Sequence, residues 1–199
     1  MNRFDNLNKF QHDAWHLLIK AAIQRKGSYQ TPTVATIGPG GNARQRVVVL
    51  READKPNRRL TLFTDARSDK VAELKERPTL SWLFWDERKK VQIRMESQAI
   101  LERGTDRCRA YWDKLPVQGR KSYAALQAPG TPQESDTETL PPFWNADMPL
   151  EDTAYAFDNF MVITGAVSFI DCLHLHADGH QRANYTWVGG EWKGQWVTP

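Results

Sequence analysis

The stretch "LTLFTDARSDKVAELKERPTLSWLFW", residues 60–85, contains a strand, a polar turn, a short helix and a second strand in succession. Leu60, Leu62 and Phe63 indicate the first strand. Ser68 is a candidate N-cap for the helix, which must end before Pro78 because proline breaks helices. The apolar and aromatic residues 79–86 then indicate the next strand. Such a helix does not recur regularly between the other expected strands, which argues against a doubly wound parallel sheet.

The flanking segments carry further strand signals. "TVATIG" is short and β-branched, "RQRVVVLRE" at 44–52 is an apolar run between arginines, and residues 89–103 alternate between apolar and polar. The strands of the last part, residues 158–199, include a Gly-Gly turn suited to a tight hairpin. Eight or nine strands joined mostly by short turns predict a mainly β fold, an antiparallel barrel or sandwich with added helices.

Helices and one long loop complete the expected organisation. Apolar spacings of three and four predict an N-terminal helix within residues 1–27. Residues 105–126 are helical in pattern, with a break near Pro116. Proline, glycine and small polar residues dominate 128–142, which predicts a mobile or extended loop. With no internal repeat, we expect one domain over 1–199.

Composition narrows the function classes. The formal charge is +3, from 27 basic and 24 acidic residues, which is too mild by itself to predict nucleic-acid binding. No apolar run approaches the roughly 18 residues of a membrane span, so we expect a soluble, cytoplasmic protein. Cys108 and Cys172 have no metal-like spacing, and His174 with His176 lacks a third ligand, so no metal is predicted. Walker, Rossmann and Gly-x-Ser-x-Gly motifs are absent.

Two cations suggest an anion site near the strand-to-helix turn. Arg46, together with Lys70 beside the start of the helix, would form a cradle for a phosphate. If 46–51 is one strand, Arg46 and Arg51 lie on opposite faces about 16 Å apart and contact different parts of a long ligand. The alternative is that these charges are solvated and merely flank a core strand. Gln92 lies on the polar side of its strand, where its amide suits a heteroaromatic edge or simply faces solvent.

The ordered set of motifs resembles the pyridoxamine 5'-phosphate oxidase family and its FMN-binding relatives. It comprises "RQRVVVLR", the stretch from residue 60 to 85, "KKVQIRMESQAILE" and "YWDKLP", and the similarity resumes at "WKGQWVTP". The resemblance covers most of residues 31–127. It implies an FMN-binding split β-barrel of antiparallel Greek-key type, usually a homodimer with two flavin sites at the subunit interface.

The resemblance also implies which residues bind the cofactor. Lys70 and Arg46 match the residues on the FMN phosphate, and Arg51 matches a basic position near the reactive ring. In the B6 oxidases a basic residue usually precedes the lysine of the turn. Asp69 occupies that position here, and Arg67, two residues earlier, could substitute for it. The full implied FMN set is Arg46, Val47, Val48, Val49, Leu50, Arg51, Phe63, Thr64, Arg67, Ser68, Lys70, Gln92 and Gln127.

The substrate site departs from the B6 oxidases. Tyr111 fits a tyrosine on the substrate phosphate, but Leu115 stands where those oxidases carry an arginine. Leu173 takes the place of a flavin-contacting tryptophan, and Asn184 falls near that of an arginine. A different acceptor site is expected, and the candidate substrate-binding residues are Arg51, Tyr111, Arg120, His180 and Arg182. Catalytic residues are left unassigned.

Three functions follow as hypotheses. The first is an FMN-dependent oxidoreductase that takes a hydride from a small molecule, with a vitamin B6 5'-phosphate as the named candidate and oxygen as a candidate acceptor. The second is a non-catalytic flavin- or haem-binding protein, with His174 or His180 as the haem ligand. The third, a nucleic-acid-binding barrel, rests only on the basic excess and the aromatic residues.

Overall fold

The structure is a computed structural model that describes residues 4–134 and 139–199. Its helices are α1 (Leu7–Gln24), α2 (Asp69–Glu76), α3 (Asp106–Trp112) and α4 (Val117–Arg120), with 3-10 helices at Ser28–Gln30, Lys121–Tyr123 and Leu150–Asn159. Its strands are β1 (Thr33–Ile37), β2 (Ala43–Val47), β3 (Glu52–Asp54), β4 (Arg59–Asp65), β5 (Thr79–Asp86), β6 (Val91–Glu102), β7 (Phe160–His174), β8 (Gln181–Val188) and β9 (Glu191–Val197).

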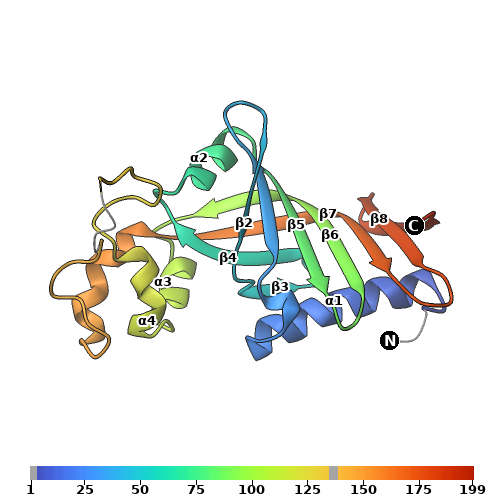
Figure 1. The fold of residues 1–199 in the computed structure, drawn as a ribbon, viewed down its shortest axis with the longest axis horizontal. Coiled ribbons are helices and arrows are strands. Elements are labelled where there is room, and N and C mark those ends of the chain that lie inside the picture. The colour runs from blue at the N-terminus through green and yellow to red at the C-terminus, as the bar shows by residue number, and fades with distance from the viewer. Residues whose placement is uncertain (1–3, 135–138) are drawn as a thin grey trace.

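The strands form one antiparallel sheet that curls into a barrel (Figure 1). Its order is β2-β1-β5-β6-β7-β4-β3, and β8 pairs with β7 and β9. β7 organises the sheet: it pairs with β6 along its length, with β4 over its first half and with β8 over its second. The prediction of a mainly β, antiparallel barrel with added helices is confirmed.

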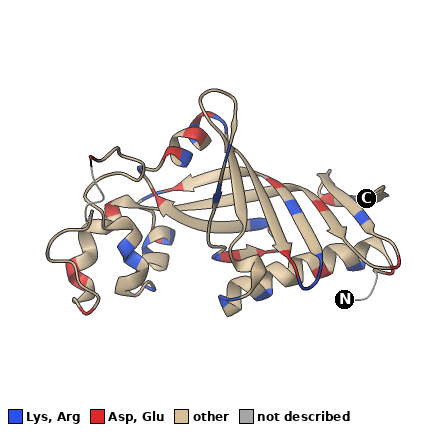
Figure 2. Ribbon diagram, viewed as in Figure 1, with Lys and Arg blue, Asp and Glu red and all other residues tan. Residues whose placement is uncertain are grey.

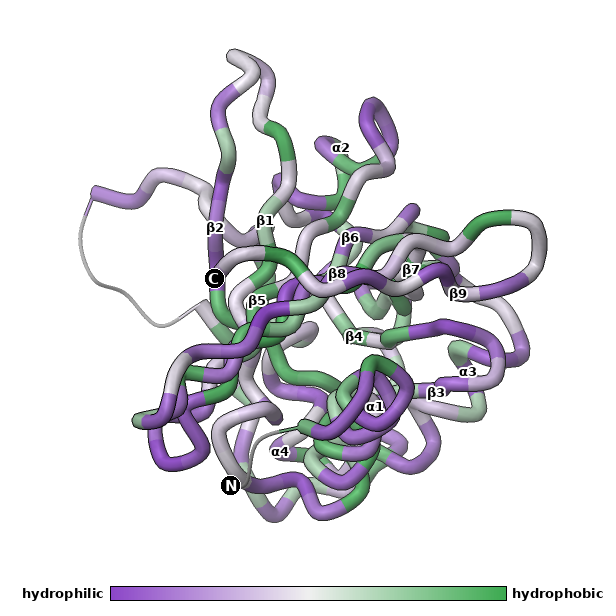
Figure 3. The backbone as a smooth tube through the Cα atoms, turned by 90° about the vertical axis from the view of Figure 1, so that its right-hand side faces the viewer, coloured by the Kyte–Doolittle hydropathy of each residue, from purple (hydrophilic) through white to green (hydrophobic). Residues whose placement is uncertain are grey.

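Alternating side chains of the central strands form the main core. Trp82 and Phe84 of β5 and Ile93 of β6 are fully buried between the strands. At Gly165 of β7 a Cβ atom would lie 2.5 Å from the hydroxyl of Ser97, so this close approach requires glycine. The buried face of α1 covers one side of the barrel, below the strands in Figure 3.

A second hydrophobic cluster lies beyond the barrel, under α3, α4 and the last 3-10 helix, at the left of Figure 1. Trp112, Tyr123 and Phe160 pack their rings against one another at its centre. Phe160 begins β7, so the strand fixes the helical cluster to the barrel.

The predicted strand over 44–52 is wrong as one element. β2 ends at Val47, and residues 48–51 are not in a strand. Val48 donates its N–H to the carbonyl of Pro32, but Pro32 has no N–H to return the bond, so the ladder stops there. The assumption that Arg46 and Arg51 stand at two ends of one regular strand therefore fails.

The other boundaries match with smaller differences. Residues 105–126 contain two short helices and a 3-10 turn on either side of the break at Pro116, and the 3-10 helix Leu150–Asn159 was not predicted. The described part of the expected loop 128–142 contains no helix or strand, and residues 135–138 lie outside the described residues. Among the helices that the structure describes, none has the length and apolar character to cross a membrane.

Candidate functional site

A pocket of about 270 Å³ lies where β2, the end of β4, the start of α2 and residues 122–129 meet. We call it the cationic pocket. Its lining residues are Arg46, Val47, Val48, Val49, Arg51, Phe63, Thr64, Asp65, Ser68, Lys70, Ser122, Tyr123 and Pro129. Most residues of the FMN set expected from the sequence therefore come together here, including both cations of the expected cradle.

Lys70 reaches this pocket from the first turn of α2. Its Nζ donates to Thr64 Oγ1 at 2.8 Å and to Ser68 Oγ at 3.1 Å. Burial lowers the pKa of Lys70, and the neighbouring charge of Arg46 lowers it further. An ammonium group has three N–H donors, so one is left without an acceptor among the described residues.

Arg46 is held by a buried polar network. Its Nη1 donates to Thr36 Oγ1 and to the carbonyl of Arg44, and its Nη2 donates to Glu73 Oε2 at 3.2 Å. Glu73 also accepts bonds from Thr36 and, at 3.0 Å, from Arg44. These bonds hold the Nη1–Nη2 edge, and they leave Nε and one Nη2 hydrogen without an acceptor in the described part of the chain. That edge can bind an oxyanion in a bidentate manner.

The turn before α2 differs from the sequence prediction. Ser68 occupies the N-cap position but makes no side-chain capping bond, because its hydroxyl donates to the carbonyl of Asp65 at 2.7 Å. Arg67 does not line the cationic pocket. It forms a bidentate pair with Asp65 and donates to the carbonyl of Ala125 at 3.0 Å, so it joins the turn to the next segment.

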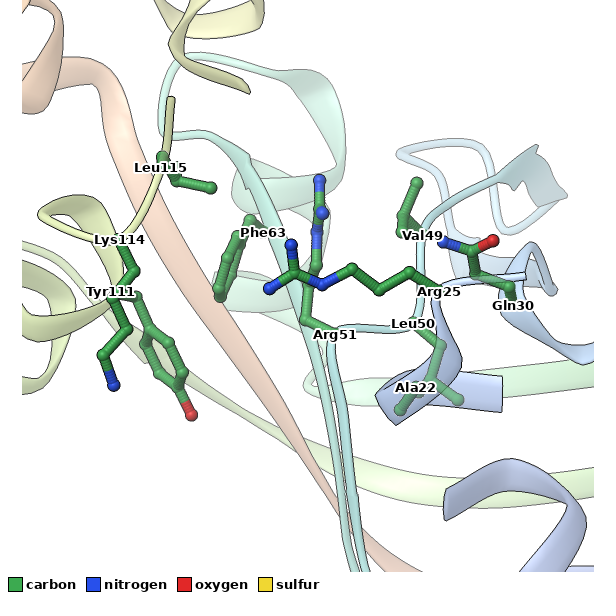
Figure 4. A pocket seen from close by; sticks show the side chains of 10 residues that line it. All are labelled: Ala22, Arg25, Gln30, Val49, Leu50, Arg51, Phe63, Tyr111, Lys114 and Leu115. Carbon is green, nitrogen blue, oxygen red and sulfur yellow. The ribbon is translucent and has the colours of Figure 1, made fainter. Parts of the chain in front are cut away.

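Arg51 stands at the junction of the cationic pocket and a smaller one. Its Nε is buried and has no hydrogen-bond partner among the described residues. Its guanidinium lies 5.2 Å from the ring centre of Phe63. The smaller pocket, which we call the adjoining pocket, holds about 150 Å³ (Figure 4). It is lined by Ala22, Arg25, Gln30, Val49, Leu50, Arg51, Phe63, Tyr111, Lys114 and Leu115.

The two glutamines of the FMN set lie elsewhere in the chain. Gln92 of β6 alternates with buried Val91 and Ile93, so it belongs to the outer face of the sheet with Arg94. Gln127 lines a neighbouring hollow that shares Ser122 and Pro129 with the cationic pocket. Within one chain, Gln127 is therefore close to the pocket, whereas Gln92 is not among its lining residues.

The candidate substrate-binding residues are not brought together in one chain. Arg51 and Tyr111 share the adjoining pocket. The Tyr111 hydroxyl donates to Glu52, and burial raises its pKa. His180 and Arg182 line a polar hollow beside β8, and Arg182 forms a bidentate pair with buried Asp171.

Arg120 is a buried structural cation. It is 5% exposed and donates to Thr153 Oγ1 at 2.9 Å and to the carbonyls of Trp112 and Leu150, each at 3.1 Å. It lies in the helical cluster, at the opposite end of Figure 1 from β8, so it does not meet His180 or Arg182 within the chain.

Neither His174 nor His180, the candidate haem ligands, lines the cationic pocket. Among the described residues there is no group of three or more potential metal ligands. His174 is 2% exposed and packs edge-on against Phe4. Cys108 and Cys172 are both free and buried. Basic and acidic residues are interspersed along the fold in Figure 2, rather than gathered by sign.

Sequence reasoning missed the residues that support the cationic pocket. Glu73 follows Lys70 by three positions on α2, which places it on the same side of the helix. Thr36 pairs with Arg44 across the β1–β2 hairpin and so lies diagonal to Arg46. The glycine-rich turn at 38–41 could have predicted this register, whereas nothing local indicated that Arg25 or Lys114 would line the adjoining pocket.

Comparisons with known proteins agree with this fold. Residues 12–102 match the model of a family described as pyridoxamine 5'-phosphate oxidase, FMN-binding domain. A pyridoxamine 5'-phosphate oxidase-related, FMN binding protein from Nostoc punctiforme PCC 73102 superposes with a TM-score of 0.72 at 20% identity, covering 94% of this chain and 96% of that chain. PhzG from Burkholderia lata 383, solved in complex with tetrahydrophenazine-1-carboxylic acid, gives 0.72 at 18% identity, covering 98% and 95%.

No curated protein matches the chain. At these identities the two solved structures establish the fold, and the family model covers residues 12–102. The resemblance expected from the sequence is thus confirmed.

Proposed function

We propose that this chain binds FMN with its phosphate in the cationic pocket and acts as an FMN-dependent oxidoreductase of a small molecule. The observation that carries the proposal is the convergence of Arg46 and Lys70 on one pocket that also presents the hydroxyls of Thr64 and Ser68. A guanidinium edge and an ammonium group are donors that a phosphate dianion prefers, and the two hydroxyls hold the ammonium group in place.

The part of the cationic pocket near Arg51 and Phe63 also fits a flavin ring. Arg51 presents a buried Nε that lacks an acceptor in the described part of the chain, and a buried donor of this kind costs free energy unless a ligand accepts from it. A flavin has carbonyls and ring nitrogens along one edge. Phe63 and the chain at 47–49 would line the rest. When bound, the flavin would supply the electron-transfer chemistry, and the protein would orient the substrate beside it.

The proposed assembly is a homodimer with FMN at the subunit interface. The outer face of the sheet exposes apolar side chains, with Leu83 and Trp85 each 39% exposed. Gln92 lies directly opposite Trp85 in the pairing of β5 with β6, and therefore on this same face of the sheet. A contact between Gln92 and flavin would therefore need a second copy of the chain, which is the arrangement that the resemblance implies.

The substrate would enter through the adjoining pocket, which shares Val49, Arg51 and Phe63 with the cationic pocket. A vitamin B6 5'-phosphate is the named candidate. Against it stands Leu115, which lines this pocket where the B6 oxidases carry an arginine and which cannot donate to a phosphate. We therefore propose a small-molecule substrate without fixing its identity.

Titration with FMN and with riboflavin, which lacks the phosphate, tests the cofactor assignment. Arg46→Ala and Lys70→Gln should each weaken FMN by about 1.5–3 kcal/mol, roughly 10–150-fold, and leave riboflavin nearly unchanged. Lys75→Gln, an exposed position on the same helix, is the matched control. If wild-type protein shows neither flavin absorbance after desalting nor quenching of flavin fluorescence, the proposal is wrong.

Turnover separates an enzyme from a flavin carrier. Incubation of FMN-loaded protein with pyridoxine 5'-phosphate in air should release peroxide if the chain is a B6-type oxidase. Bleaching of the flavin band by other small reductants without oxygen would support oxidoreductase function with another substrate. A flavin band that no candidate substrate bleaches would favour the non-catalytic alternative.

A further inference from the structure

The adjoining pocket has an unusual charge composition. Of the residues that line it, Arg25, Arg51 and Lys114 are cations, and none is acidic in the part of the chain that the structure describes. Three different elements supply them: the end of α1, the segment after β2 and the turn after α3. Cations gathered from separate elements around one small cavity favour an anionic occupant.

Arg25 occupies a backbone position that does not favour it. It is the C-cap of α1 with φ of 50°, and its N–H bonds to the carbonyl of Ala21. Glycine or asparagine is the usual choice for this left-handed conformation, because other side chains are disfavoured there. Figure 4 shows the Arg25 side chain extending from the end of α1 toward Phe63 and Arg51. A long cationic side chain is thus held at a strained position and directed into the pocket.

The protein itself does not supply counter-charges inside the pocket. Arg25 and Lys114 have no side-chain acceptor among the described residues, and the buried Nε of Arg51 has none either. Glu52, which follows Arg51 in the chain, accepts from Tyr111 and lies 3.8 Å from Arg107. The pocket therefore offers several charged donors and no matching acceptor.

We propose that the adjoining pocket binds an oxyanion group on the substrate, a carboxylate or a phosphate monoester, and that Arg25 is a specificity-determining residue for it. The apolar walls from Ala22, Phe63 and Leu115 suit the carbon part of a small, flat molecule. This inference rests on the proposed function, since the shared residues place such a substrate beside the flavin site. Arg25, whose guanidinium reaches toward Phe63 (Figure 4), replaces the donor that is missing at Leu115.

Binding of defined probes to the FMN-loaded protein tests the inference. Benzoate and phenyl phosphate represent the two anion classes, and benzyl alcohol is the neutral comparison. We expect calorimetry and difference spectra of the flavin to detect binding of at least one of the two anions, and no binding of the alcohol. Anion binding should weaken as the salt concentration rises. Arg25→Gln should weaken the bound anion about tenfold or more and change the dissociation constant of FMN by less than about twofold.

Lys26→Gln is the matched control, because Lys26 is exposed like its neighbour Arg25 but does not line the pocket. The inference is overturned if benzyl alcohol binds as tightly as the anions, if Arg25→Gln leaves anion binding unchanged, or if neither anion binds wild-type protein at millimolar concentration. Preference for benzoate would identify a carboxylate substrate, and preference for phenyl phosphate a phosphate monoester.

A failure of the proposed function can be distinguished from a failure of this inference. If FMN does not bind, calorimetry of the protein as isolated still reports binding of benzoate or phenyl phosphate. Anion binding that depends on Arg25 would then support the site without the flavin. Arg25→Gly provides a second variant whose backbone is favoured at this position, so a loss of anion binding there cannot be attributed to misfolding.

Discussion

Arg46 and Glu73 form an ion pair between the β1–β2 hairpin and α2, with 3.2 Å between Nη2 and Oε2, and the Glu73 side chain is only 3% exposed. This pair fixes one edge of the guanidinium against the helix and leaves the other edge free. The cationic pocket therefore depends on a buried carboxylate that does not itself line it.

Replacing this carboxylate should reveal its role through pH. Burial alone would raise the pKa of Glu73, but hydrogen bonds from Thr36 and Arg46 outweigh it and hold the pKa below the ordinary 4.5. A lowered pKa in the folded state means that the carboxylate stabilises the fold above pH 4.5, and that this stabilisation is lost as the pH falls further. We expect Glu73→Gln to lower the free energy of unfolding by about 1–3 kcal/mol at pH 7 and by less near pH 4.

Urea denaturation at the two pH values measures this difference. Glu76→Gln is the control, since Glu76 lies on the same helix with its side chain 63% exposed and 3.6 Å from Arg77. It should change stability little at either pH. An effect of Glu73→Gln that is equal at pH 7 and pH 4 would contradict the assignment.

Lys70 predicts a second pH dependence, at the alkaline end. Burial and the charge of Arg46 lower its pKa from 10.5, so the ammonium loses its proton earlier than an ordinary lysine as the pH rises. The affinity for FMN should fall over that range, because only the charged amine attracts a phosphate. Lys70→Arg should remove this dependence, since arginine stays protonated.

Fluorescence titrations between pH 7 and 10 measure the effect. Riboflavin serves as the reference, because ionisation of the ring affects both flavins equally and only FMN carries the phosphate. If the ratio of the two affinities stays constant in wild-type protein, Lys70 does not bind the phosphate.

Much of the fold could be predicted because it depends on local pattern. Alternation along 89–103 and the Pro78 stop each determine an element within a few residues, and β6 and α2 follow them closely. The prediction of a single strand over 44–52 was wrong because Pro32, just before β1, ends the pairing of the two strands. An apolar run does not reveal whether its partner can continue the ladder.

The site was predictable where one motif carries both members of a contact. Lys70 with Ser68 and Thr64 belongs to a single turn, and the structure joins them. Arg67 also donates to the carbonyl of Ala125, and Arg120 donates to the carbonyl of Leu150; both carbonyls approach only through tertiary packing. Charge alone could not separate these structural arginines from ligand-binding ones.

Arg120 provides a test of that distinction. Its removal leaves buried carbonyls and the Thr153 hydroxyl without their donor, and it also removes the guanidinium 4.6 Å from the ring centre of Trp112. We expect Arg120→Leu to destabilise the fold by about 2–4 kcal/mol, measured by urea denaturation. Exposed Lys121→Gln is the control. Unchanged stability with weaker substrate binding would instead support the role expected from the sequence.

The strained position of Arg25 gives the opposite expectation for stability. With φ at 50°, glycine at this C-cap relieves a backbone cost of about 1–2 kcal/mol, partly offset by the greater freedom of glycine in the unfolded chain. Arg25→Gly should therefore raise the free energy of unfolding by about 0–1 kcal/mol. At Lys26, whose φ is not positive, Lys26→Gly should lower it by roughly 0.5–1 kcal/mol.

Urea denaturation of the two variants, paired with the benzoate titration, separates the two reasons for an arginine at position 25. If Arg25→Gly keeps or gains stability and loses anion binding, the side chain serves the pocket at the expense of the helix end, as expected for a functional residue in a disfavoured conformation. A loss of more than about 1 kcal/mol would mean that the guanidinium stabilises the fold directly. The adjoining pocket would then need another cation to select its substrate.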